Sequence, residues 1–363
     1  MIDLAKMEER CSMKSIPTAV TLKDIAEKSG VSITTASRIL NKRESGLPIR
    51  EETRQRVLAI AAELGYKPNL LARGLRGSNS SLIGVIARDI SDPFHTVVLR
   101  GINDAAAQRG YRLFLGHVDY RSDVAIAYAS MFEQSHADGI IVIGDIEGDE
   151  AAIEVLMTRH PHVVGVTDRV SRRQFPGVYI DNVLGTRLAL DHLWNLGHRN
   201  ILCVSYPHIE DGGLRAEVYQ QYMQEHGAGD KIRVFLTSQD LEPSYQAGQE
   251  IFASFIEPNR PTAIFAASDA IAIGLLQAAF QAGISIPAQV SIVGFDNLEI
   301  TPFTIPPLTT VSQSGLEMGQ LAANLLLDMI EQNRKNSEVE DIVMNPTLII
   351  RQSTAAPSSI NRD

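Results

Sequence analysis

From Leu82 onward the chain alternates short apolar runs with amphipathic segments, and no other feature constrains the fold as strongly. Short apolar runs between polar turns are typical of buried strands, and the longer segments between them carry apolar residues at helical spacing. This alternation predicts an α/β fold of parallel sheets with helices on both faces. The expected strands are 82–87, 112–116, 140–143, 163–166, 200–204, 233–236, 263–266 and 291–295.

The expected helices fall into two runs, which predicts two lobes separated near Tyr179–Asn182. These helices are 97–110, 124–134, 150–159, 185–196, 215–226, 245–256 and 271–282. A last helix at 315–333 and a last strand near 348–350 belong to neither run. If each lobe receives one of these two elements, the chain crosses between the lobes three times. Such lobes form a hinged clamp whose cleft faces the carboxyl ends of the strands, where ligands bind in open α/β sheets.

Charge is distributed unevenly along the 363 residues, although the net charge of -10 alone would argue against nucleic acid. Residues 1–80 carry 14 Lys and Arg against 9 Asp and Glu, a net of +5. The remainder carries 19 against 34, a net of -15. Attraction for phosphate is therefore confined to the amino-terminal part of the chain.

Within that basic part, Thr21–Asn41 predicts two short helices joined by a tight turn. Thr21 and Asp24 have the spacing of a capping box at the first helix. Gly30 suits the positive φ of a helix end, and Ser32 is placed to cap the second helix.

The second helix has an inward apolar stripe and an outward polar face. The inward residues are Ala36, Ile39 and Leu40, and the outward ones are Ile33, Thr34, Ser37, Arg38 and Asn41. A short polar face with one arginine suits the major groove of DNA. The alternative is a solvated helical hairpin without function.

A third helix is expected at about Glu51–Leu64, with Val57, Leu58, Ala61 and Leu64 as its apolar stripe. The segment after it, around Leu71 and Leu75, predicts one or two turns of helix, too short to be stable alone in water. Such a segment would order only against another surface. The alternative is a flexible linker.

Cysteine usage and the amino terminus indicate a cytoplasmic protein. Cys11 and Cys203 form no metal-ligand cluster, and a reducing compartment fits them. The first twenty residues lack the apolar core of a signal peptide, and no apolar run reaches membrane-spanning length. We expect neither a metal nor another cofactor, and no membrane partner.

These features together resemble the LacI/GalR (lactose-repressor) family of transcriptional regulators over about Val20–Ser353. The motifs that carry the resemblance are V-T-L-K-D-I-A-E-K-S-G-V-S-I-T-T-A-S-R-I-L-N, G-Y-K-P-N-L-L-A-R-G-L-R, L-I-G-V-I, D-P-F-H, I-D-N, L-G-H-R-N-I, S-D-A-I-A-I-G, V-S-I-V-G-F-D-N and P-P-L-T-T-V. The resemblance implies a small all-α helix-turn-helix head and a two-lobed clamp, similar to periplasmic binding proteins, built from doubly wound parallel sheets.

The expected domains follow from this arrangement. They are a disordered leader at 1–19, a helix-turn-helix domain at 20–66, a hinge helix and linker at 67–80, an N-terminal lobe at 81–180 and 311–333, a C-terminal lobe at 181–310 and 334–353, and a tail at 354–363.

The resemblance also implies which residues contact DNA. Base contacts fall on Ile33, Thr34 and Arg38; phosphate contacts on Ser32, Thr35, Ser37 and Asn41; and minor-groove contacts on Leu75 and Arg76. Ile33 could instead belong to the core, and Arg38 could form a surface ion pair.

For a small effector in the clamp, the matching positions are Asp92, Phe94, Asp168, Arg215, Asp269 and Asp296, with Phe303 as a second aromatic wall. Carboxylates, one arginine and aromatic rings suit a polyhydroxylated sugar. The alternative roles are helix capping for Asp269 and loop capping for Asp296. Arg215 is expected at a helix start, where a cation is unfavourable unless a ligand pairs with it.

The resemblance thus implies a sequence-specific DNA-binding transcriptional regulator. It is expected to be a repressor whose affinity for a pseudo-palindromic operator changes when a sugar or sugar derivative binds. A homodimer is favoured, because no leucine-heptad tail follows Ile350. The alternatives are a corepressor-dependent regulator responding to a nucleobase or nucleoside, and a sugar-binding protein without a regulatory role. An enzyme is not expected, since the chain carries none of the common catalytic motifs.

Overall fold

The computed structural model describes residues 20–40, 48–66, 80–119, 121–144, 150–167, 175–206, 210–255 and 260–358. The chain divides into two compact units, 1–76 and 77–363, which we call the head and the clamp. Outside the described residues lie the expected leader and hinge helix, with Leu75 and Arg76, together with Asn41 and Asp168.

The described head contains α1 (Leu22–Ser29), α2 (Ile33–Leu40) and α3 (Glu51–Glu63). The predicted capping box is confirmed, because the Thr21 hydroxyl accepts a hydrogen bond from the amide of Asp24 and the Asp24 carboxylate accepts one from the amide of Thr21. Gly30 ends α1 with a φ of 64°, as expected.

The head has a small core built from one stripe of each helix. Its buried members are Ile25, Ala26, Ala36, Ile39, Val57 and Ala61. The prediction that Leu58 belongs to this core is wrong, because its side chain is 41% exposed. Val57 and Ala61 occupy the inward face of α3, and Ile60 packs beside them, so Leu58 is turned toward solvent.

The clamp contains two six-stranded sheets, with strand orders β11-β5-β4-β3-β1-β2 and β12-β10-β9-β8-β6-β7. The first comprises β1 (Leu82–Ala87), β2 (Arg112–His117), β3 (Gly139–Ile143), β4 (Val163–Thr167), β5 (Gly177–Ile180) and β11 (Ile342–Met344). The second comprises β6 (Ile201–Ser205), β7 (Val234–Leu236), β8 (Ala263–Ala266), β9 (Ser291–Asp296), β10 (Thr309–Ser312) and β12 (Thr347–Ile349). All neighbours are parallel except β10 and β12, which confirms the predicted doubly wound parallel sheets.

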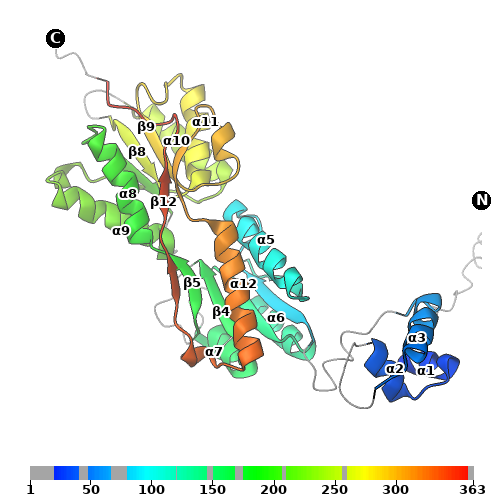
Figure 1. Ribbon diagram of the computed structural model, residues 1–363. Helices are drawn as coiled ribbons and strands as arrows, with labels where there is room; N and C mark the ends of the chain where they lie inside the picture. Colours follow the sequence, from blue (N-terminus) through cyan, green and yellow to red (C-terminus); the bar gives the residue numbers. More distant parts are fainter. Residues whose placement is uncertain are drawn as a thin grey trace, which may run out of the picture. The chain divides into compact units, whose positions relative to one another are not determined.

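Helices cover both faces of each sheet (Figure 1). On the first sheet, α5 (Pro93–Gln108) and α12 (Gly315–Gln332) pack on one face, and α6 (Ser122–Gln134) and α7 (Glu150–Arg159) on the other. On the second, α8 (Asn182–Asn195) and α9 (Glu210–Glu225) pack on one face, and α10 (Leu241–Ala253) and α11 (Asp269–Gln281) on the other. Short 3-10 helices lie at Gly229–Lys231, Thr301–Phe303 and Asn336–Glu338. None of the described helices is both long and apolar enough to cross a membrane.

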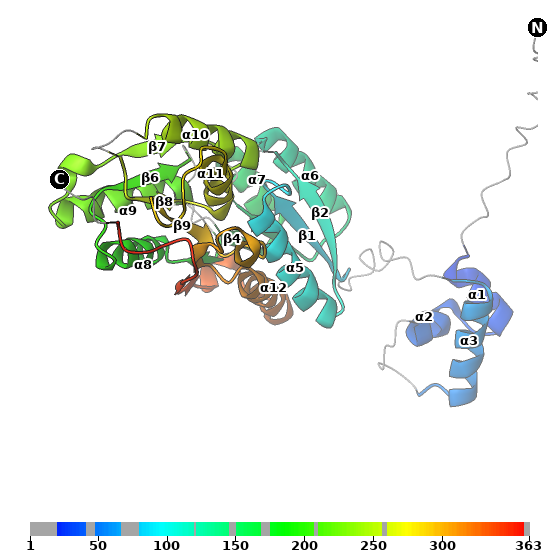
Figure 2. The same ribbon diagram turned by 90° about the horizontal axis from the view of Figure 1, so that it is seen from above.

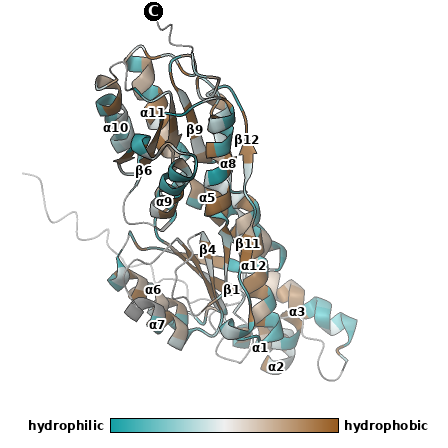
Figure 3. Ribbon diagram, turned by 90° about the vertical axis from the view of Figure 1, so that its left-hand side faces the viewer, coloured by the Kyte–Doolittle hydropathy of each residue, from teal (hydrophilic) through white to brown (hydrophobic). Residues whose placement is uncertain are grey.

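Each lobe therefore buries an apolar sheet between two helix layers, as the strands between α10 and α8 show in Figure 2. Coloured by hydropathy, the strands are largely brown, whereas the outer helices alternate brown and teal (Figure 3). This is the pattern expected where strands are buried on both faces and each helix buries one stripe.

The chain crosses between the two lobes after β5, after β10, and between β11 and β12, so the expected three crossings are confirmed. The predicted lobe boundaries are wrong at two places. Residues 311 and 312 belong to β10 of the second sheet, and β11 joins the first sheet although 334–353 was assigned to the C-terminal lobe. Strands of three or four residues are too short to show a period in the sequence.

Candidate functional site

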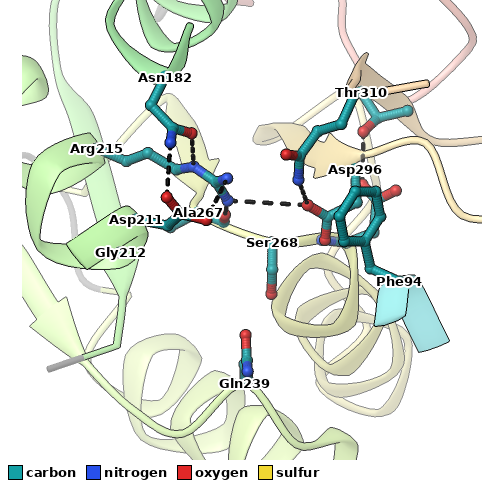
Figure 4. A network of polar contacts seen from close by, with 12 residues as sticks. Phe94, Asn182, Asp211, Gly212, Arg215, Gln239, Ala267, Ser268, Asp296 and Thr310 are labelled. Carbon is teal, nitrogen blue, oxygen red and sulfur yellow. Dashed lines mark hydrogen bonds and ion pairs between the residues drawn. The ribbon is translucent and has the colours of Figure 1, made fainter. Parts of the chain in front are cut away.

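Several predicted effector residues meet where strands of both sheets end (Figure 4). Asp92 follows β1 and caps α5, Asp296 is the last residue of β9, and Asp269 is the first residue of α11 after β8. Arg215 reaches the same region from α9. The carboxyl ends of parallel strands thus bring these side chains together, as in other open α/β sheets.

Arg215 is the buried centre of this network, with 1% of its surface exposed. Its Nε donates to Asn182 Oδ1 at 2.9 Å, its Nη1 donates to the Ala267 carbonyl at 2.6 Å, and its guanidinium covers the Phe295 ring at 3.7 Å. The expectation that it stands at a helix start is wrong, because α9 begins at Glu210. Carboxylates inside the protein, rather than a ligand alone, therefore balance its charge.

The partners of Arg215 include two residues that the sequence analysis did not single out. Asp211 Oδ2 lies 3.6 Å from Arg215 Nη2, and Asn182 Nδ2 donates to Asp211 Oδ1 at 2.6 Å. The separation of four residues between Asp211 and Arg215 on one helix was a usable signal. Asn182 lies in the I-D-N motif, but nothing local in the sequence indicates that it would contact Arg215.

Asp269 is fully buried and its carboxylate is used inside the lobe. Its Oδ2 accepts from the amide of Leu298 at 2.8 Å, and its Oδ1 accepts from the Thr310 hydroxyl at 2.6 Å. The alternative role of helix cap is wrong, because the Ser268 side chain caps α11, and Asp269 connects the loop after β9 to β10. Burial and the nearby Asp296 both raise the pKa of Asp269.

Asp296 lies between the buried network and the other lobe. Its backbone φ of 122° is unusual for a residue with a side chain, and its Oδ1 accepts from Gln313 Nε2 at 2.5 Å. Burial raises the pKa of Asp296 to about 7; Arg215, 3.8 Å away, opposes this shift, whereas Asp92 adds to it. A carboxyl group with such a pKa can exchange a proton near neutral pH.

This pKa predicts a pH dependence of stability. The folded protein holds the Asp296 proton more tightly than the unfolded chain, whose pKa is near 3.8, so stability should fall as pH rises from about 4 through about 7. Asp296→Asn removes this titration, so the stability of the variant relative to the wild type should increase as pH rises over that interval. Urea unfolding midpoints of both proteins from pH 4.5 to 8 would measure the difference, and a difference that is flat with pH would contradict the assignment.

Asp92 and Phe94 come from the first lobe. Asp92 Oδ1 accepts from the amide of Phe94 at 2.8 Å, and its Oδ2 accepts a long hydrogen bond of 3.5 Å from Gln239 Nε2 of the second lobe. The buried Phe94 ring packs where a Cβ on Gly315 would lie, at 2.8 Å. Phe94, Asp296 and Gly315 help to line a cavity of about 380 Å³ between the lobes.

A second cavity, of about 630 Å³, lies beside this network, where β1, β2, β6 and β7 end. It is lined by Asp89, Ser91, His117, Asp119, Tyr206, Leu236, Thr237, Ser238, Gln239 and Asp240. Gln239 thus reaches both the Asp92 carboxylate and this cavity. Phe303, expected as an aromatic wall, is 77% exposed and lines neither of these two cavities.

In the head, the predicted DNA contacts lie on and beside α2. Ile33 is 44% exposed and Thr34 is exposed, whereas Ser37 and Arg38 are partly buried. Ser32 Oγ accepts from the amide of Thr35 at 3.1 Å, so the expected cap of α2 is confirmed. Exposure of Ile33 excludes the alternative that it belongs to the head core.

Comparison with known proteins agrees with both units. The model of bacterial regulatory proteins of the lacI family matches residues 21–69, and that of the periplasmic binding protein-like domain matches residues 190–354. The first match covers the helices of the head, and the second covers most of the second lobe and its connections.

Relatives and solved structures extend the likeness to nearly the whole chain. The HTH-type transcriptional regulator DegA of Bacillus subtilis (strain 168) is 34% identical over 92% of this chain and 98% of its own length. The HTH-type transcriptional repressor CytR of Escherichia coli (strain K12) is 33% identical over 94% and 98%. A crystal structure of the lac repressor dimer, bound to operator and the anti-inducer ONPF, superposes with a TM-score of 0.81 at 26% identity, covering 93% of this chain and 100% of that one. The chain therefore belongs to the lacI family of bacterial regulatory proteins.

Proposed function

We propose that this regulator represses transcription by binding a pseudo-palindromic operator as a homodimer and releases it when a small effector occupies the clamp. The outward face of α2 carries the DNA half of the proposal. Ile33 and Thr34 are exposed beside the capped start of the helix, which suits entry of that end into a major groove.

Within this proposal, Ile33, Thr34 and Arg38 read bases. Arginine can pair bidentately with a guanine edge, and an apolar side chain or a threonine methyl can pack on thymine. Ser32, Thr35, Ser37 and Asn41 would hold phosphates and so position the helix without reading sequence.

Arg38→Ala should cost about 1–3 kcal/mol of preference for the operator over random DNA, since it removes the long donor of α2 that can read a base edge. Competition titrations of operator and random duplexes at fixed salt would measure this preference. Arg56→Ala, on the exposed surface of α3, is the matched control, because it loses the same charge from another helix. An equal loss of preference in both variants would show that Arg38 supplies only general attraction for phosphate.

The proposal also includes the dimer and its coupling to the clamp. Leu75 and Arg76 would enter the minor groove from a hinge helix that orders when two copies meet on DNA. A second copy of the clamp would cover apolar side chains that are now exposed in the second lobe. The most exposed are Ile305 at 90%, Phe280 at 78% and Phe303 at 77%.

The effector half of the proposal rests on the network around Arg215 and Asp296. Residues from both lobes approach each other there, so a ligand that binds between them changes the relation of the lobes. Asp168, the residue after β4 in the sequence, is proposed as a further ligand contact on its sequence match. The lac repressor neighbour was solved with a small molecule as well as operator DNA, which supports a ligand-controlled regulator.

A further inference from the structure

The first two crossings between the lobes each place an amide side chain beside the charged groups of the candidate effector site. The first crossing is a single residue, Asp181, because β5 ends at Ile180 and α8 begins at Asn182. The second crossing consists of Gln313 and Ser314, which separate β10 from α12. Asn182 is 7% exposed and Gln313 is 2% exposed, so both side chains are buried.

Asn182 orients the guanidinium of Arg215 from the first crossing (Figure 4). Its Oδ1 accepts a hydrogen bond from Arg215 Nε at 2.9 Å. Its Nδ2 donates to Asp211 Oδ1 at 2.6 Å, and Asp211 Oδ2 lies 3.6 Å from Arg215 Nη2. Both polar ends of one amide are therefore used to orient the arginine, through hydrogen bonds to charged partners, which are stronger than neutral ones.

Gln313 makes the equivalent contact with Asp296 from the second crossing. Its Nε2 donates to Asp296 Oδ1 at 2.5 Å, and the same oxygen lies 3.8 Å from Arg215 Nη1. Asn182, Arg215, Asp296 and Gln313 thus connect the two crossings in this order, and we call these four side chains the hinge network. Arg215 and Asp296 have only 1% and 10% of their side chains exposed, so their attraction is little screened by water.

The surroundings of the hinge network leave little room for independent movement. The amide of Asp181 donates to the carbonyl of Met344 at the end of β11, and its carboxylate accepts from the amide of Leu184 in α8. The first crossing is therefore attached to both lobes. The Phe295 ring covers the guanidinium of Arg215 at 3.7 Å. Close-packed groups of this kind transmit a displacement to their neighbours.

We propose that Asn182 and Gln313 are positioning residues that couple the Arg215–Asp296 pair to the first two crossings, so that a ligand that displaces this pair changes the relation of the lobes. Without the two amides, a ligand could still bind between the lobes, but its contact with the pair would no longer reach the crossings. This inference rests on the proposed role of the cleft as the effector site.

Hydrogen–deuterium exchange of the full-length protein tests the coupling in the absence of effector and DNA. The reporter is the peptide that covers the first crossing, residues 178–186, and peptides from β6 and β8 report on unfolding of the whole second lobe. Asn182→Ala should raise exchange in the reporter about tenfold, because one hydrogen bond to a charged group is lost. Gln313→Ala changes the other crossing and should nevertheless raise exchange in the reporter about threefold, through the hinge network.

The double variant shows whether the two effects share one network. Asn182→Ala combined with Gln313→Ala should exchange in the reporter no more than about twofold faster than Asn182→Ala alone, because the network is already broken. The matched controls are Asn195→Ala and Gln332→Ala, which remove exposed amides at the last residues of α8 and α12. Each control should change exchange in the reporter by less than about twofold.

Three outcomes would overturn the proposal. They are an unchanged reporter in Gln313→Ala, effects that multiply in the double variant, and increases in β6 and β8 as large as that in the reporter, which would show a general loss of stability. If Asn182→Ala does not fold, Arg215→Lys replaces it, since lysine keeps the charge but lacks the Nε–H that donates to Asn182. A protein that bound no small molecule would contradict the proposed effector site and leave these exchange rates unaffected, so the two failures can be distinguished.

Discussion

Gly319→Ala is expected to lower the free energy of unfolding by about 3 kcal/mol, because no room exists for a methyl group where α12 crosses α5. A Cβ at this position would lie 2.1 Å from the carbonyl oxygen of Val98 and 2.9 Å from the amide nitrogen of Ile102. Both are backbone atoms, so a change of side-chain rotamer cannot relieve the contact. The two helices would have to separate, and the first lobe would lose part of its packing.

A second glycine at the same crossing limits how far the two helices can move to make room for the methyl group. A Cβ on Gly101 of α5 would lie 2.1 Å from the carbonyl oxygen of Leu316. Each helix thus lies directly against the backbone of the other, and buried side chains such as Ile102 and Leu326 fix the pair on the sheet. Moving α12 outward would open a void beneath these side chains, which is itself destabilising.

Urea unfolding of the variant beside the wild type would measure this loss. Gly213→Ala is the control, since it lies within α9 and its Cβ would meet nothing within 4 Å. Alanine is the better helix former by about 1 kcal/mol, so this control should be neutral or stabilising. If Gly319→Ala unfolded at the same urea concentration as the wild type, the close approach of the helices would be wrong.

Arg215→Ala should be the most damaging change in the candidate effector site, lowering the free energy of unfolding by about 3–5 kcal/mol. It leaves the carboxylates of Asp211 and Asp296 without their shared cation and leaves the Ala267 carbonyl without its donor. The variant should also lose its response to effector. DNA binding by the head should persist wherever the protein remains folded.

An exposed ion pair and the pH dependence of the stability loss provide two controls for this prediction. Arg187→Ala also removes an ion pair from the second lobe, but Arg187 and Glu225 are far more exposed, so its cost should stay within about 1 kcal/mol. Without Arg215 the pKa of Asp296 should rise further above about 7, so the deficit should shrink as pH falls and Asp296 takes up a proton. A deficit that does not change between pH 5 and pH 8 would mean that lost packing, rather than unpaired charge, causes the damage.

The features predicted correctly from the sequence depend on residues that are close together in it. The capping box of Thr21 and Asp24 spans three residues, and Gly30 takes its positive φ because it ends a helix. Most strands of the clamp were recognised because each of these is an apolar run with clear ends. Asp92 and Asp296 were identified as candidates because they belong to motifs that carry the family resemblance, D-P-F-H and V-S-I-V-G-F-D-N.

The errors involve positions whose environment is set by distant residues. Leu58 was placed in the core because its spacing suits a stripe, but the way α3 packs turns it outward. β5, β10 and β11 were not recognised, since runs of three or four residues carry little pattern of their own and each strand is defined by its pairing with a neighbour. The start of α9 was placed too late, which made Arg215 look like a terminal residue.

By itself, then, the amino-acid sequence determined the helix-turn-helix of the head, the alternating α/β order of the clamp and the strand ends that carry acidic residues. Hydrophobic periodicity and capping act within a few residues, so they can be read along the chain. Only the tertiary structure decided that Arg215 is buried against Asn182, that Gly101 lies against α12 and Gly319 against α5, and that Gln313 donates to Asp296. Contacts between residues far apart in the chain follow from packing, and packing decides which charges lose water and how they are paired.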